Sequence, residues 1–178
     1  MLLAVPYQTI ELAKLHIEPF HTDKRNRRIA PLLYKDNSLT LTSCSILSPP
    51  CELIGYDAAA NRLQLKIDNR VFSNRLYAMQ DYFANHLFAS RVLPALSLKE
   101  IHGILQKLYL PTTLTVYAYP STPVLSTGVQ PTTVGALEPG TPIQFVLRIH
   151  GLLLLEDRGT PHIRIQHSLI AISVGDRR

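Results

Sequence analysis

The feature that most constrains the fold is a pair of alternating runs near the end of the chain, residues 142–151 and 161–174. In the first run the apolar residues are Ile143, Phe145, Leu147 and Ile149, and the polar ones are Gln144, Arg148 and His150. Successive side chains of a strand point to opposite faces, so this period of two predicts a half-buried strand.

The second run repeats the pattern. Its apolar residues are Ile163, Ile165, Leu169 and Ala171, and its polar residues are His162, Arg164, Gln166 and Ser168. The turn sequence Glu156–Thr160 lies between the runs and predicts a β-hairpin with one apolar face. Arginine, histidine and glutamine on the other face suit a polyanion, although an ordinary solvated sheet surface has the same pattern.

Composition limits the class of protein. The chain has 178 residues, of which 46% are hydrophobic, enough for one globular domain with a sizeable core. Its formal net charge is +5 at pH 7. This mild basic bias is compatible with nucleic acid as a partner without requiring it.

The cysteines and the N-terminus bear on the compartment. Cys44 and Cys51 are the two cysteines, too few for a secreted disulfide framework, and no His or Cys pair beside them has the spacing of a zinc site. The N-terminal apolar run is too short for a signal peptide, and no run reaches the length of about 20 apolar residues that a membrane span needs. We expect an intracellular protein with free thiols and no membrane association.

Further strands and helices are predicted upstream. Period-two patterns predict strands at Thr9–Ile17, Arg62–Asp68 and Thr113–Tyr119. The apolar run Ile29–Tyr34 and the run Leu39–Ile46, rich in β-branched residues, are joined by the turn Lys35–Ser38 and predict a hairpin. From Val71 to about Arg91 apolar residues recur every three or four positions, which predicts a helix. A second helix begins after Ser97, which forms a capping-box pattern with Glu100, and is expected to end before Pro111.

This order of elements predicts an α+β fold of mostly antiparallel strands, in a single domain spanning residues 1–178. The number of strands favours an oligonucleotide-binding (OB)-like Greek-key barrel with a helical insert at about 71–109. A β-sandwich with a helical insertion is the competing architecture. Residues 120–142 are rich in Pro, Thr, Ser and Gly, and we expect a long flexible loop there.

Several groups are candidates for nucleic-acid contact. Lys24, Arg25, Arg27 and Arg28 form a cationic loop that suits a phosphate backbone, a solvated surface or a nuclear-localisation signal. Arg62 and Lys66 lie on the predicted outer face of their strand. Tyr117 and Tyr119 share the polar face of another strand, where they stack on bases or cover the edge of the core.

Motifs of catalysis do not stand out. The sequence has no phosphate loop, dinucleotide fingerprint or nucleophile elbow. Acidic residues are scattered, and the seven histidines fall in different predicted elements, except His162 and His167, which are placed on opposite faces of one strand. We therefore expect a protein that is not an enzyme and that uses no cofactor and no metal.

The layout resembles the single-stranded-DNA-binding proteins of large double-stranded DNA viruses, of the African swine fever virus and iridovirus type. The resemblance runs through 29–41, 48–57, a helical stretch, a strand ending in Tyr117-Ala118-Tyr119 and a closing hairpin around 147–151. It implies a non-catalytic OB-like barrel that coats exposed single strands in viral replication, recombination or packaging, without strong sequence preference. It also implies a location in the host cytoplasm or nucleus at replication sites, or in the virion.

On this hypothesis the partner is single-stranded DNA, with RNA as an alternative, and a homo-oligomer is a further option. The expected nucleic-acid contacts are Lys24, Arg25, Arg27, Arg28, Arg62, Lys66, Tyr117, Tyr119, Arg148, His150 and Arg164. The alternative function is a non-catalytic virion or protein-interaction component that uses the loop at 120–142 and an exposed strand edge.

Overall fold

The computed structural model describes residues 3–126 and 132–175, and strands dominate it. The strands before the helices are β1 (Val5–Pro6), β2 (Leu15–Ile17), β3 (His21–Thr22), β4 (Arg28–Asp36), β5 (Leu39–Leu41), β6 (Cys44–Leu47), β7 (Cys51–Asp57) and β8 (Arg62–Lys66). Helices α1 (Arg70–Ala89) and α2 (Leu98–Ile104) follow, and then β9 (Tyr109–Leu110), β10 (Thr113–Tyr117), β11 (Val124–Leu125), β12 (Pro142–Asp157) and β13 (Thr160–Val174).

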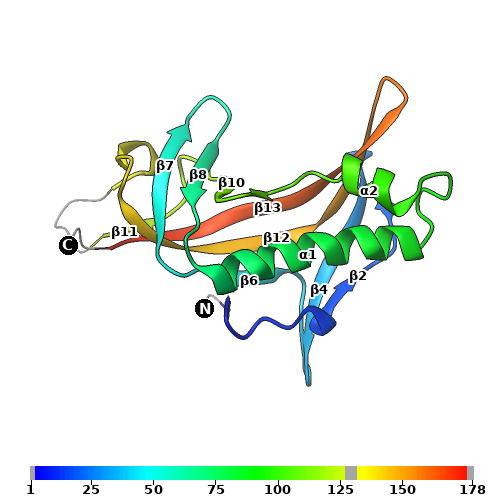
Figure 1. The fold of residues 1–178 in the computed structure, drawn as a ribbon, viewed down its shortest axis with the longest axis horizontal. Coiled ribbons are helices and arrows are strands. Elements are labelled where there is room, and N and C mark those ends of the chain that lie inside the picture. The colour runs from blue at the N-terminus through cyan, green and yellow to red at the C-terminus, as the bar shows by residue number, and fades with distance from the viewer. Residues whose placement is uncertain (1–2, 127–131, 176–178) are drawn as a thin grey trace.

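The closing hairpin β12–β13 runs the length of the molecule, as Figure 1 shows, and confirms the prediction from the alternating runs. Its strands are joined by the two-residue turn Arg158–Gly159, whose φ angles of 49° and 80° suit a tight hairpin connection. The other edge of β12 pairs in succession with β7, β6 and β4. The hairpin is therefore the backbone of the sheet.

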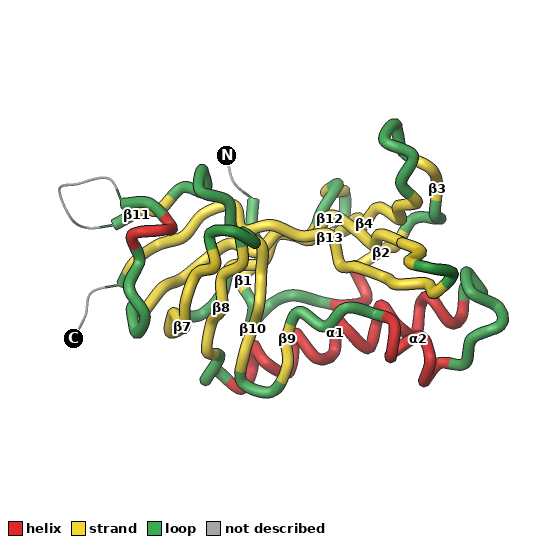
Figure 2. The backbone as a smooth tube through the Cα atoms, turned by 90° about the horizontal axis from the view of Figure 1, so that it is seen from above, coloured by secondary structure: helices red, strands yellow, loops and turns green. Residues whose placement is uncertain are grey.

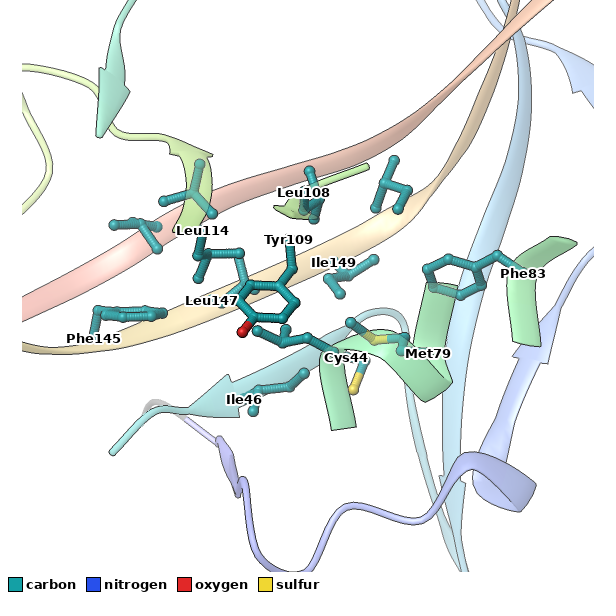
Figure 3. Packing of buried hydrophobic residues seen from close by; sticks show 14 of the residues in the cluster. Cys44, Ile46, Met79, Phe83, Leu108, Tyr109, Leu114, Phe145, Leu147 and Ile149 are labelled. Carbon is teal, nitrogen blue, oxygen red and sulfur yellow. The ribbon is translucent and has the colours of Figure 1, made fainter. Parts of the chain in front are cut away.

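The apolar face of β12 forms the centre of the core. Phe145, Leu147 and Ile149 are buried there, and α1 packs across them through Met79 and Phe83 (Figure 3). Helix α1 begins where it was predicted. The side chain of its N-cap residue, Asn69, accepts a hydrogen bond from the backbone N–H of Phe72. The capping box of α2 is confirmed as well.

A bulge changes the predicted face of β13. Val146 is in register with Ala171, but Leu147 is in register with Leu169, so Ile170 is an extra residue. The alternation shifts by one beyond it. Ile172 is therefore buried, whereas Ala171, predicted to share the apolar face, is only half-buried.

Three other predicted elements have different bounds. The strand predicted at Leu39–Ile46 is divided into β5, which pairs with β4, and β6, which pairs with β12. Within Thr9–Ile17 only β2 is a strand, because residues 12–14 form a 3-10 turn in which Lys14 makes ion pairs with Glu11 and Asp36, both at 2.8 Å. The second helix ends at Ile104 and not just before Pro111, since the Gln106 N–H donates to the carbonyl of Ile163 at 2.7 Å. Leu105 and Gln106 thus lie beside β13, and the carbonyl of Leu108 accepts the N–H of Thr115 in β10.

The predicted α+β class with mostly antiparallel strands is confirmed. The described strands form an open sheet, and its closure into an OB-like barrel stays a prediction. Of the predicted loop at 120–142, residues 127–131 lie outside the described residues, and the rest contains β11 and a 3-10 turn, Val134–Ala136. Both cysteines are free thiols, and burial raises the pKa of each to about 12.

Candidate nucleic-acid interface

The candidate site lies where the sheet folds back on itself. Strands β7, β8 and β10 form an antiparallel meander at one end of the molecule (Figure 2), and β10 lies alongside β13. Among the described strands β10 pairs with β8 and β9 and shares no ladder with β13. The two strands are joined instead by a side chain, because the backbone N–H of Tyr117 donates to His167 Nε2 at 3.1 Å.

The imidazole of His167 uses both of its nitrogens. Nδ1 lies 2.7 Å from the carbonyl oxygen of Ile165, so Nδ1–H donates and Nε2 accepts, which is the pattern of a neutral histidine. Only 6% of the residue is exposed, and this burial lowers its pKa below the ordinary value. The Tyr117 ring lies over it with centroids 5.2 Å apart, and the Arg62 guanidinium carbon lies 5.7 Å from the Tyr117 centroid.

A groove follows β10 past this stack. It consists of three adjoining pockets that share lining residues, and we call it the β10 groove. The first pocket, about 470 Å³, is lined by Gly55, Tyr56, Asp57, Arg62, Gln64 and Thr115. The central pocket, about 200 Å³, is lined by Arg62, Gln106, Lys107, Thr115, Val116, Tyr117 and His167. The third, about 410 Å³, is lined by Gly103, Ile104, Leu105, Gln106, Leu155, Asp157, His162, Ile163 and Arg164.

Charged residues of both signs line the groove. Arg62, Lys107 and Arg164 line it at successive positions, while Asp57 and Asp157 line the two outer pockets. The Lys107 ammonium donates to His102 Nδ1 at 3.3 Å, and partial burial lowers its pKa. Cations are therefore concentrated in the middle of the groove, where a polyanion is held best.

The basic loop lies elsewhere, at the end of the molecule that carries β3 and β4 (Figure 2). Asp23 organises this loop: its Oδ1 accepts the N–H groups of Arg25 and Arg27 at 2.9 and 2.8 Å, and its Oδ2 forms an ion pair with the Arg27 guanidinium at 2.8 Å. These contacts, that of the Arg27 N–H first, lower the pKa of Asp23. Arg27 thus has a structural role, whereas Lys24 and Arg25 are exposed.

Three further candidates, Arg28, Arg148 and His150, are not among the residues that line the groove. Arg28 is in register with Leu154 of β12, and Arg164 is in register with its neighbour Leu153, so the two arginines point to opposite faces of the sheet. The Arg148 Nε–H donates to Ser45 Oγ at 3.1 Å, on the face of β12 that points away from the core.

His150 lies 3.3 Å from Ser168 Oγ through its Nε2. Burial, and secondarily the charge of Arg148, lower its pKa, so its ordinary form is neutral. It therefore adds no charge to this face at neutral pH.

Lys66 and Tyr119 flank the groove. Lys66 shares the outer face of β8 with Arg62, four residues away, and its Nζ lies 3.4 Å from an oxygen of Asp68. Tyr119 follows β10 and is 49% exposed, so its ring is open to solvent. Tyr117, in contrast, is half-buried between the side chains of Arg62 and His167.

Sequence reasoning did not select Gln106, Lys107 or His167 for this surface. Gln106 and Lys107 were expected inside a helix, and the one local sign against it is Gly103, which weakens helices. His167 lies in phase with the apolar residues Ile163, Ile165 and Leu169 of its strand, and this position indicates burial. It does not indicate the hydrogen bond that His167 accepts from β10. The Gln106 Oε1 is buried and has no hydrogen-bond donor among the described residues.

Two other kinds of site have no support in the described residues. Within residues 3–126 and 132–175, no group of three or more His, Cys, Asp or Glu side chains is arranged to hold a metal ion. No helix in the same residues has both the length and the apolar character to cross a membrane. Comparison of the chain with protein-family models, curated proteins and solved structures finds no match.

Proposed function

We propose that the protein binds single-stranded DNA along the β10 groove, without strong sequence preference. The observation that carries this proposal is the groove itself, three adjoining pockets beside β10 that include Arg62, Lys107 and Arg164 among their lining residues. Channels of this kind hold a single strand through its phosphates, and they recognise charge and shape rather than the edges of the bases.

The aromatic contribution to binding is expected from Tyr119. Tyr117 already contacts His167 on one neighbouring strand and Arg62 on the other, so a base would have to displace one of them. Tyr119 lies two residues further on, and its ring is half exposed. Stacking of one base on such a ring contributes about 1–3 kcal/mol.

The groove favours a single strand over a duplex because of its size. Each pocket has a volume of a few hundred Å³ or less; the half-buried Lys107 lines the smallest one, and the exposed Arg62 and Arg164 line the pockets on either side of it. A flexible strand can follow such a channel with its phosphates, whereas the stiff double helix presents only one side to it. Lys66 and the exposed Lys24 and Arg25 are expected to contact a longer strand that leaves the groove.

The viral role is a further part of the proposal, and it rests on the order of elements described above. On this view the protein coats exposed strands during viral replication, recombination or packaging, acts without a catalytic centre, and has an OB-like barrel formed by β7, β8, β10, β12 and β13. The hydrogen bond from the backbone N–H of Tyr117 to His167 Nε2 supports such a closure, since it joins β10 to β13.

The test is a titration of a fluorescent single strand of about 30 nucleotides, and of the matching duplex, at about 50 and about 200 mM salt. We expect the single strand to bind more tightly, with an affinity that falls steeply between the two salt concentrations. Equal affinity for the duplex would remove the single-strand preference. Absence of binding at the lower salt concentration would refute the function.

A second function, a non-catalytic virion or protein-interaction component, is favoured by a separate observation. Strands β5 and β9 lie at outer positions of the described sheet, and each carries a half-exposed leucine, Leu39 at 49% and Leu110 at 58%. Outer strands with apolar side chains can add a strand of a partner. Failure of the DNA titration together with a concentration-dependent rise in mass in sedimentation would favour this function.

A further inference from the structure

We infer that the central pocket of the β10 groove is a phosphate-binding subsite, with Arg62 and Lys107 as its two cationic ligands. The inference deepens the proposed function and rests on it for the source of the phosphate, a nucleic-acid strand. The shared chemistry is a phosphate group, either an internal phosphodiester or a terminal phosphomonoester.

The charges of this pocket favour an anion. Its lining includes two cationic side chains, Arg62 and Lys107, and no carboxylate, whereas each flanking pocket is lined by an aspartate. Asp81 lies close enough to raise the pKa of Lys107, but it is not among the lining residues, and burial has the larger effect. An anion is therefore attracted most strongly to the central pocket, because in each outer pocket an aspartate offsets the charge of an arginine.

The two cations are also held in place before any ligand binds. Arg62 lies over the Tyr117 ring at 5.7 Å, and Lys107 donates to His102 Nδ1 at 3.3 Å. They come from β8 and from the segment 105–108, on either side of β10. A group held between them would receive hydrogen bonds from both sides, with less side-chain entropy to lose than from free surface lysines.

Hydrogen bonding excludes other roles for this pocket. Both nitrogens of His167 are engaged, so its imidazole offers no free lone pair for a metal ion or for a proton from a substrate. The half-buried Thr115 adds a hydroxyl that can donate to a phosphate oxygen. The donors present are those of an anion site.

The central pocket is also small. A pocket of about 200 Å³ is smaller than the range of about 300–1,000 Å³ that encloses most whole small-molecule ligands. It shares lining residues with the pocket on each side, so the neighbouring groups of a bound chain would lie against those pockets. The central pocket thus suits one charged group of an extended molecule.

The experiment titrates inorganic phosphate into the whole ¹⁵N-labelled protein and follows the backbone amides by NMR. We expect saturable shifts of the Thr115, Val116 and Tyr117 amides. Lys107→Gln and Arg62→Gln should each weaken the phosphate affinity at least tenfold. Lys99→Gln, which removes an exposed cation of α2 outside the groove, should leave it unchanged.

Several outcomes would overturn the inference: no shifts at β10, shifts spread over all exposed cations, or a Lys107→Gln protein that behaves as the wild type. If single strands bind but phosphate does not shift these amides, the subsite fails while the proposed function stands. If phosphate binds as expected and single strands do not bind, the subsite stands and the proposed function fails. Comparison of one oligonucleotide with and without a 5′-phosphate then separates the two sources, since only a terminal site gains affinity from the added group.

Discussion

Replacement of His167 by leucine tests whether a side chain joins the two halves of the sheet. The substitution keeps a similar volume but removes both ring nitrogens. The partly buried N–H of Tyr117 then loses its acceptor at 3.1 Å, which costs about 1–3 kcal/mol, and the loss of the hydrogen bond to the Ile165 carbonyl costs about 0.5–1.5 kcal/mol more. We expect His167→Leu to lower the free energy of unfolding by about 2–4 kcal/mol.

The assay is urea denaturation of the two proteins, followed by circular dichroism. His162→Leu is the matched control, because His162 lies on the same strand and is exposed, and we expect it to change the free energy of unfolding by no more than about 0.5 kcal/mol. If the two variants were equally stable, the His167 bond would not hold β10 to β13.

The same residue predicts a dependence on pH. Burial lowers the pKa of His167 in the folded protein below its value in the unfolded chain, so the unfolded chain binds the proton more readily. Stability should therefore be constant above about pH 7.5 and fall as the pH drops below about 6.5, by at most about 1.4 kcal/mol per pH unit for this one proton. His86 and His150 shift in the same direction, so His167→Leu should reduce this slope without abolishing it. An unchanged slope would contradict the neutral, buried imidazole.

The remaining predictions concern packing and the basic loop. Gly151→Ala should destabilise the protein by about 1–3 kcal/mol, because a Cβ there would lie 2.3 Å from the Ala30 carbonyl oxygen. Gly103→Ala, within α2 and with open space around it, should stabilise the protein by about 0.5–1 kcal/mol. Thermal denaturation of the two variants and the wild type measures both changes. Gln80→Leu should lower the free energy of unfolding, measured by urea denaturation, by about 2–4 kcal/mol, since Gln80 Oε1 accepts the N–H groups of Leu108 and Tyr109 at 2.9 and 3.0 Å. Its control, Asn74→Leu on the exposed face of α1, should change this free energy little. Lys24→Gln with Arg25→Gln should leave the affinity for a strand of about 8 nucleotides unchanged and weaken that for one of about 30, and a loss with the short strand would place the loop in the primary site.

Local patterns predicted much of the fold. The β12–β13 hairpin, β8, β10 and α1 follow from periodicity, and the start of α2 follows from its capping box. Each of these signals lies within a short stretch of chain. The bulge at Ile170 and the early end of α2 were not predictable in this way, because the first depends on the register with β12 and the second on a hydrogen bond to Ile163.

The candidate site depends almost wholly on contacts between distant parts of the chain. Sequence reasoning selected Arg62, Tyr117 and Arg164, which line the groove, but also Arg148 and the basic loop, which lie away from it. Alternation predicts that a cation on a strand points outward. The side of the molecule on which it lies depends on the pairing and twist of the strands. Lys107 lines the groove because the segment after α2 leaves the helix and lies beside β13, a contact between distant parts of the chain.

The most direct test of the account is the salt dependence of single-strand binding by a groove variant. The triple variant Arg62→Gln, Lys107→Gln, Arg164→Gln removes the cations of the groove, and Arg70→Gln, Arg91→Gln, Lys99→Gln removes the same charge from exposed positions elsewhere. A single strand gives a log–log salt slope of about −0.7 per phosphate contact, so the groove variant should lose about two units of slope. The account predicts that loss together with an unchanged slope in the control variant. Equal slopes in the two variants would show that the strand binds elsewhere.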